Sequence, residues 1–304
     1  MKKFYLSALF LGAFTFAIQA QVVQSEDFDS YSLDYISPQS ILWKTWSGAE
    51  EGEEDAMVSA LQARSGSNSL NIVRDGNGND ILYLIDDMPF DGIYSIRMYF
   101  YIPTGQEAYF NLQGEIFGNN QGSGSFLSGD HYFNPDNMTP GQGQNADGSF
   151  IWTFPHDQWF PVVLVVDLDT KTYSMDVDNN GGIPAGTPFN NLAVPYLGAI
   201  YFYAPSSFTN FFIDDITIAQ GLLNVNDVKL SSVKVFPNPM TDVLNISSND
   251  IIDEVTIYDI TGKIILSQTP NSVSPVINTS QFAKGVYLVK ITIDGSSKVI
   301  KVMK

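Results

Sequence analysis

Two neighbouring segments of the chain combine tyrosines with amide and charged side chains on one side of an extended backbone. In residues 94–102, alternate positions are apolar and are expected to face a core. The positions between them point the other way, and they hold Ser95, Arg97, Tyr99 and Tyr101. Residues 109–116 repeat the pattern, and their outward positions hold Tyr109, Asn111, Gln113 and Glu115.

These residue types favour sugar binding. Aromatic rings stack on the apolar faces of pyranoses, and planar polar groups fix the positions of hydroxyl groups. We therefore predict a ligand-binding set, namely Arg97, Tyr99, Tyr101, Tyr109, Asn111, Gln113 and Glu115. The alternative is that the outward tyrosines simply pack under a second layer, since tyrosine is common in strands.

Acidic residues near the two ends of the same region predict a metal site. Glu26 lies in the first expected strand, and Asp214 and Asp215 lie in the last one. Carboxylates are ligands for calcium, so these three residues predict a structural calcium ion that joins the two strands. Because two adjacent acids on a strand point to opposite faces, only one of Asp214 and Asp215 is expected inside. A separate acidic run, residues 50–55, is expected to form a solvated loop.

Catalytic signals are weak in this sequence. The two histidines, His131 and His156, have no metal-ligand spacing, and no nucleophile elbow is present. A polysaccharide lyase could use Arg97, Tyr99, Gln113 and His131, and a glycosidase could use Glu115 with a second carboxylate. A glycan-binding protein without catalysis, an enzyme of either type and an adhesin that recognises protein therefore remain open, and we favour the first.

Charge separates two regions of the chain. Residues 21–222 hold 26 acidic and five basic side chains, a difference of −21, whereas residues 229–304 hold six acidic and eight basic ones, a difference of +2. The strongly acidic region argues against nucleic acid as a partner, because phosphate would be repelled. The chain has no cysteine, so thiolate metal sites and disulfides are excluded.

Short alternating runs separated by turn residues predict an all-β fold for residues 21–220. The spacing of these runs is typical of a two-sheet sandwich or jelly roll. Residues 118–148, rich in Gly, Asn and Gln, are expected to form one long irregular loop.

The first 20 residues have the pattern of a secretory signal peptide. Lys2 and Lys3 precede an apolar run from Phe4 to Ile18, and Ala20 closes a small-residue cleavage site. The apolar run is too short for a membrane span, and no later run reaches the required length, so we expect no integral membrane segment.

Three ordered motifs mark the C-terminal region: residues 235–239 (VFPNP), 255–263 (VTIYDITGK) and 284–304, which end in a basic strand. Together they resemble the type A C-terminal sorting domain of the type IX secretion system of Bacteroidetes. The resemblance implies a small Ig-like β-sandwich over residues 230–304. It also implies export to the outer cell surface, with the secretion machinery and a sortase-like peptidase as partners.

A second resemblance covers residues 21–220. The segments 26–29 (EDFD), 159–168 (WFPVVLVVDL) and 212–216 (FIDDI) are similar to concanavalin-like and laminin-G-like jelly rolls. Segments 110–114 and 155–160 resemble an uncharacterised flavobacterial version that precedes type IX sorting domains. The chain is therefore expected to hold a signal peptide (1–20), a jelly roll (21–220), a linker (221–229) and a sorting domain (230–304).

Overall fold

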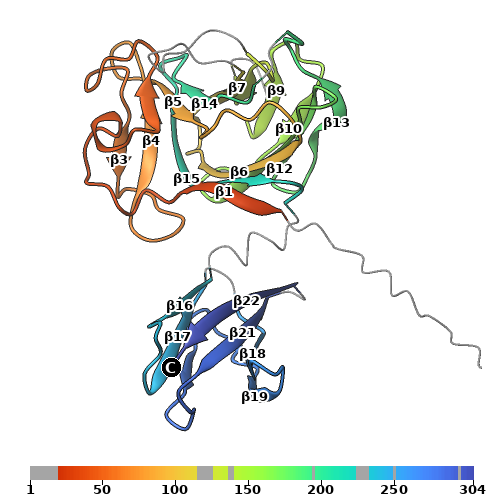
Figure 1. Ribbon diagram of the computed structural model, residues 1–304. Helices are drawn as coiled ribbons and strands as arrows, with labels where there is room; N and C mark the ends of the chain where they lie inside the picture. Colours follow the sequence, from red (N-terminus) through yellow and green to blue (C-terminus); the bar gives the residue numbers. More distant parts are fainter. Residues whose placement is uncertain are drawn as a thin grey trace, which may run out of the picture.

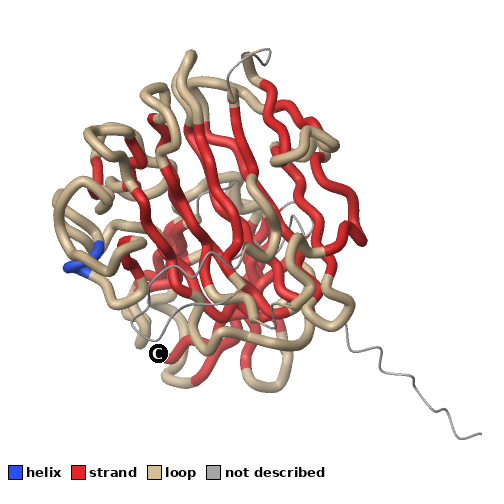
Figure 2. The backbone as a smooth tube through the Cα atoms, turned by 90° about the horizontal axis from the view of Figure 1, so that it is seen from above, coloured by secondary structure: helices blue, strands red, loops and turns tan. Residues whose placement is uncertain are grey.

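The computed structural model describes residues 20–114, 126–135, 140–193, 196–223, 233–248, 251–293 and 296–304. Nearly all of this backbone is strand or loop, and the one helical element in these ranges is a short 3-10 turn, η1 (Ser37–Gln39) (Figure 2). The predicted all-β class is confirmed. No helix in the described ranges is long and apolar enough to cross a membrane.

The larger unit is a sandwich of two antiparallel sheets, and its first sheet has eight strands. Its strands, in spatial order, are β13 (Gly182–Pro188), β12 (Thr172–Val177), β11 (Trp159–Asp167), β6 (Ile93–Tyr101), β15 (Asn210–Gln220), β4 (Ser69–Val73) and β3 (Met57–Ser59), while β1 (Gln21–Glu26) also pairs with β15. Strand β6 lies at the centre of this sheet, where it pairs over most of its length with β11 on one side and β15 on the other.

The second sheet has seven strands. In spatial order they are β10 (Ile151–Thr153), β9 (Gln142–Asn145), β8 (His131–Phe133), β7 (Ala108–Gln113), β14 (Ala199–Tyr203), β5 (Asp80–Leu84) and β2 (Trp43–Thr45). In Figure 1, β5, β7 and β14 lie along the upper side of the larger unit, and β1, β6 and β15 lie along its lower side.

The core of the sandwich follows from the alternation of apolar residues. Along β11 the buried positions are every second one, and they face the inner side chains of the other sheet. Phe100 of β6 lies at the centre, with its ring 5.6 Å from that of Phe110 on β7 and 5.6 Å from that of Phe211 on β15. Burial of each such ring contributes on the order of 2 kcal/mol.

The prediction of one long irregular loop over residues 118–148 is wrong in part. Strands β8 and β9 lie within this segment and extend the seven-stranded sheet. Its glycine-rich composition hid these strands. Gly143 is required there, since a Cβ atom at this position would lie 2.2 Å from Nε1 of Trp152 on β10. Other parts of the segment lie outside the described residues.

Residues 233–304 form a smaller sandwich with its own core. One sheet orders β16 (Lys234–Phe236), β17 (Val243–Ser247) and β20 (Val276–Asn278), and the other orders β19 (Ile264–Gln268), β18 (Glu254–Asp259), β21 (Val286–Ile293) and β22 (Ser296–Met303). Its core includes Ile257, Val289 and Ile291. The predicted linker lies partly outside the described residues.

Candidate functional site

The predicted ligand-binding residues do not lie together, because β6 and β7 belong to different sheets. Ile96, Met98 and Phe100 of β6 face the same core as Phe110 and Leu112 of β7. The outward residues of the two strands therefore lie on opposite outer faces of the sandwich. Arg97, Tyr99 and Tyr101 form one group, and Tyr109, Asn111 and Gln113 form the other, while Glu115 lies outside the described residues.

The first group is engaged by neighbouring side chains. The guanidinium of Arg64 lies 3.5 Å from the centre of the Tyr99 ring, which is a cation–π contact. The Tyr101 ring contacts those of Trp159 and Phe212. Arg97 is only 4% exposed. Tyr99 and Tyr101 are half-buried, and their rings are held by these contacts.

A β-bulge explains how Asp214 and Asp215 reach the same neighbour. The register of β15 against β6 shifts between Asp214 and Thr217, and Asp215 has a positive φ of 48°. Asp214 Oδ2 accepts hydrogen bonds from the backbone N–H groups of Arg64 and Ser65, and Asp215 accepts from the Ser65 hydroxyl and pairs with the Arg64 guanidinium. The expectation that the two carboxylates point to opposite faces is wrong.

Glu26 points to the core side of the eight-stranded sheet. It pairs with the core residue Ile216, and its carboxylate accepts hydrogen bonds from Tyr31 Oη (2.8 Å) and Trp43 Nε1 (3.2 Å). It therefore does not converge with the Asp214 and Asp215 carboxylates. In the described ranges, no group of three or more His, Cys, Asp or Glu residues could hold a metal ion. The calcium ion remains a prediction for metal-binding measurements.

The outer face of the seven-stranded sheet, in contrast, gathers five half-buried or buried aromatic side chains with amides and carboxylates. One row crosses the strands: Asp80 of β5 pairs with Tyr203 of β14, and Tyr109 of β7 pairs with Tyr132 of β8. The two pairs are neighbours, because the centroids of the Tyr203 and Tyr109 rings lie 6.0 Å apart. Because adjacent strands lie about 4.8 Å apart, the row extends over roughly 15 Å.

A second row lies two residues further along β5, β14 and β7, and it extends onto β2. In this row, Lys44 of β2 pairs with Leu82 of β5. Tyr201 of β14 pairs with Leu82 on one side and with Asn111 of β7 on the other. The Tyr201 ring stacks on that of Tyr203 with 10° between their planes. The centroid of the Trp46 ring lies 5.0 Å from that of the Tyr201 ring. We call the outer-face residues Trp46, Asp80, Tyr109, Asn111, Gln113, Asp130, Tyr132, Tyr201 and Tyr203 the aromatic face.

A chain of hydrogen bonds runs along the centre of the aromatic face. Gln113 Nε2 donates to Asn111 Oδ1 at 3.0 Å, and Asn111 Nδ2 donates to the Tyr109 hydroxyl at 2.6 Å. The Tyr109 hydroxyl donates to Asp130 Oδ1 at 2.6 Å, and Tyr132 donates to Asp130 Oδ2 at 3.3 Å. Each of these four side chains thus donates a hydrogen bond within the face.

Two acceptors on this face lack donors among the described residues: Gln113 Oε1 and Asp80 Oδ1. Gln113 has no exposed surface, so its free carbonyl oxygen is a buried acceptor. Burial raises the pKa of Asp80 to about 6, despite a hydrogen bond from Tyr201 that acts in the opposite direction. Burial likewise raises the pKa of Tyr132 to about 12, helped by the charge of Asp130, and raises those of Tyr109 and Tyr201 further.

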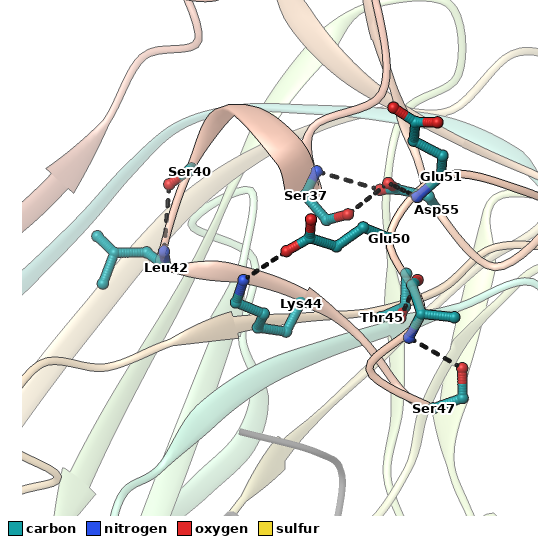
Figure 3. Close-up of polar contacts among 10 residues, drawn as sticks. Ser37, Ser40, Leu42, Lys44, Thr45, Ser47, Glu50, Glu51 and Asp55 are labelled. Carbon is teal, nitrogen blue, oxygen red and sulfur yellow. Dashed lines mark hydrogen bonds and ion pairs between the residues drawn. The ribbon is translucent and has the colours of Figure 1, made fainter. Parts of the chain in front are cut away.

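The loop beside Lys44 is ordered by its acidic residues (Figure 3). Lys44 Nζ lies 3.2 Å from Glu50 Oε1, and Glu54 Oε2 accepts hydrogen bonds from the Ser47 hydroxyl and N–H group. Asp55 is only 1% exposed and accepts four hydrogen bonds, from Ser37 N and Oγ, Glu51 N and Ala56 N. The expectation of a fully solvated acidic loop is therefore wrong at Asp55.

The residues proposed for a lyase are not assembled. Arg97 and Tyr99 lie on the other sheet, and His131 faces the core, with its ring stacked on Phe110 at 4.7 Å. Complete burial lowers the pKa of His131 to about 4.

Sequence reasoning missed Trp46, Asp80, Asp130, Tyr132, Tyr201 and Tyr203. The alternation of residues 199–203 (AIYFY) does place Tyr201 and Tyr203 on one side of a strand. It does not show that this strand lies beside Tyr109, because only the sheet order decides that.

Comparisons with known proteins find a family match for the C-terminal region and weaker similarities for other parts of the chain. Residues 234–304 match the family described as the secretion system C-terminal sorting domain. The predicted type IX sorting domain is thus confirmed, and it directs the protein to secretion and to the outer surface. The chain is also 26% identical over 191 residues to an endo-acting ulvan lyase of Formosa agariphila, a match over 62% of this chain but only 33% of that protein.

Solved structures with a similar arrangement include the cellulose induced protein Cip1 and the CBM22-1 xylan-binding domain from Paenibacillus barcinonensis Xyn10C. Cip1 is 15% identical with a TM-score of 0.42, and the match covers 66% of this chain and 99% of Cip1. The xylan-binding domain is 12% identical with a TM-score of 0.36, and the match covers 68% of this chain and 98% of that domain.

Proposed function

We propose that this protein is an exported polysaccharide-binding protein whose jelly roll binds glycan without catalysis, through the aromatic face. The observation that carries the proposal is the row Tyr203, Tyr109 and Tyr132, with the amides of Asn111 and Gln113 beside it. The half-buried rings of Tyr203, Tyr132 and Trp46 offer surface to a pyranose. Together with Asp80 of β5, the row crosses four strands, as an extended polysaccharide chain would.

We also propose that export of this protein requires two signals. Residues 1–20 act as a signal peptide for the inner membrane, and the sorting domain acts at the outer membrane. A sortase-like peptidase then removes the sorting domain within or near the linker. N-terminal sequencing of the secreted protein and mass measurement of its C-terminus test both cleavages.

The chemistry of the face supports binding rather than catalysis. A general base works best when its pKa is near the operating pH. The pKa values of Tyr109, Tyr132 and Tyr201 are all raised, which disfavours the phenolate that would abstract a proton. Lys44, the one lysine or arginine on a strand of this sheet in the described ranges, is paired with Glu50. It is therefore not free to neutralise a uronate carboxylate.

A polysaccharide lyase is the second candidate, and the similarity to the ulvan lyase favours it. Such an enzyme would abstract the proton beside the uronate carboxylate and expel the glycosidic oxygen, which leaves an unsaturated sugar. The full chain would then raise the ultraviolet absorbance of an ulvan solution. Binding without this absorbance, and without new reducing ends, supports the non-catalytic function.

Affinity electrophoresis in gels that contain polysaccharide tests the binding proposal. We expect retardation by at least one polysaccharide, and a loss of about tenfold in affinity for Tyr203→Ala or Tyr132→Ala, equal to about 1.4 kcal/mol. Tyr99→Ala is the matched control on the opposite sheet and should bind normally. Equal losses for Tyr99→Ala and Tyr203→Ala, or no retardation by any polysaccharide, would overturn the proposal.

A further inference from the structure

We infer that the aromatic face selects neutral polysaccharides and excludes sulfated or carboxylated ones, an inference that rests on the proposed function. The reason is the charge of the face and of the region around it, which is acidic in both places.

Charge opposes the binding of an anionic polymer. Asp80 and Asp130 lie on the face, and Glu50 and Glu54 belong to the adjoining loop. Lys44 is the one lysine or arginine on the strands that the structure describes in this sheet, and its ammonium is already paired with Glu50. The whole region from residue 21 to residue 222 has a charge difference of −21. An anionic polymer is therefore repelled both at the site and on approach to it.

The other basic side chains of the sandwich have protein partners, and their charges are already included in the difference of −21. Arg64 is paired with Asp215, Arg74 donates to the carbonyl groups of Ala204 and Pro205, and Lys171 donates to the carbonyl group of Leu192. Arg97 is buried on the opposite sheet. The site thus differs in chemistry from what an anionic substrate such as ulvan needs, although the chain resembles part of an ulvan lyase.

Affinity electrophoresis of the full chain with matched neutral and anionic polymers tests the inference. The neutral set is xylan, galactomannan, laminarin and hydroxyethylcellulose, and the anionic set is carboxymethylcellulose, dextran sulfate and ulvan. We expect retardation by a neutral polymer and none by the anionic set. Retardation by an anionic polymer as strong as by any neutral one overturns the inference but leaves glycan binding intact. No retardation by either set overturns glycan binding itself.

A charge variant sharpens the test. Asp80→Asn keeps the shape of the side chain and removes its charge, so we expect affinity for carboxymethylcellulose to rise about threefold or more. Asp91→Asn removes the same charge from an exposed position that is not on the aromatic face, and it should have a smaller effect. Equal gains for the two variants would mean that net charge alone excludes anions, and would overturn the role assigned to the site.

Discussion

The hydroxyl group of Tyr109 donates a 2.6 Å hydrogen bond to the carboxylate of Asp130, and this contact holds the central ring of the aromatic face. Tyr109 lies on β7, whereas Asp130 precedes β8, so the bond ties together two neighbouring strands. Tyr132 donates to the same carboxylate. Asp130 therefore positions two of the rings that we propose to contact glycan.

Replacement of Asp130 should loosen both rings. Asp130→Ala leaves the buried Tyr109 hydroxyl without its acceptor, so we expect the free energy of unfolding to fall by about 1–3 kcal/mol. Affinity for the bound polysaccharide should fall at least tenfold. Urea denaturation and affinity electrophoresis measure the two effects. Asp91→Ala, at an exposed site, is the control; equal stability of the Asp130 and Asp91 variants would contradict this role.

Stability should depend on pH through the buried carboxyl groups. Burial raises the pKa of Asp80 to about 6 and that of Asp214 to about 7, the latter also because of the charge of Asp215. A carboxyl group with a raised pKa in the folded state favours folding when protonated, so its contribution is complete below about pH 4 and is lost as the pH rises through 6–7. We expect a higher Tm at pH 5 than at pH 8.

An isosteric variant separates this effect from net charge. Asp80→Asn removes one titrating group and should reduce the difference in Tm between pH 5 and pH 8. Asp91→Asn changes the net charge equally but should leave that difference nearly unchanged. Calorimetry at the two pH values measures both variants, and identical profiles for them would exclude a specific effect of Asp80.

Arg64 should stabilise the fold without a role in glycan binding. Its guanidinium pairs with Asp215 and lies over the Tyr99 ring. Arg64→Ala removes both contacts, so we expect a loss of roughly 1–2 kcal/mol in the free energy of unfolding. Affinity for polysaccharide should not change, because the aromatic face is on the opposite sheet. A tenfold loss of affinity in a folded Arg64→Ala variant would place a binding site on this sheet instead.

Removal of divalent metal should leave the fold intact. The carboxylates of Glu26, Asp214 and Asp215 already accept hydrogen bonds from protein donors. We therefore expect the same Tm in EDTA and in calcium. A rise of several degrees in calcium, absent in Glu26→Gln or Asp215→Asn, would support the calcium ion predicted from the sequence.

Gly143 should tolerate no side chain. A Cβ atom there would lie 2.2 Å from Trp152 Nε1 and 2.6 Å from the Tyr132 backbone oxygen. Gly143→Ala therefore forces β8, β9 and β10 to shift, and we expect a loss of about 1–3 kcal/mol. Gly105→Ala is a useful comparison, because a Cβ atom added at Gly105 would have nothing within 4 Å. Its backbone has a positive φ of 80°, so some cost is expected there as well.

The sequence by itself determined the all-β class, the sorting domain and the inward or outward direction of most strand residues, because alternation has a period of two whatever the neighbours are. That reasoning placed Phe100 and Phe110 in the core and Tyr109 on the outer face of its sheet, as the structure has them. It failed at Asp214 and Asp215, where a bulge adds a residue and breaks the alternation.

Only the tertiary structure decided which outward residues meet. The strands with Tyr101 and Tyr109 follow each other along the chain, yet the chain crosses between them from one sheet to the other. Tyr109 therefore lies beside Tyr132 and Tyr203, the latter more than 90 positions away, and not beside Tyr101. Alternation describes one strand at a time, whereas a binding face depends on strand order and register, which arise from packing of the whole core.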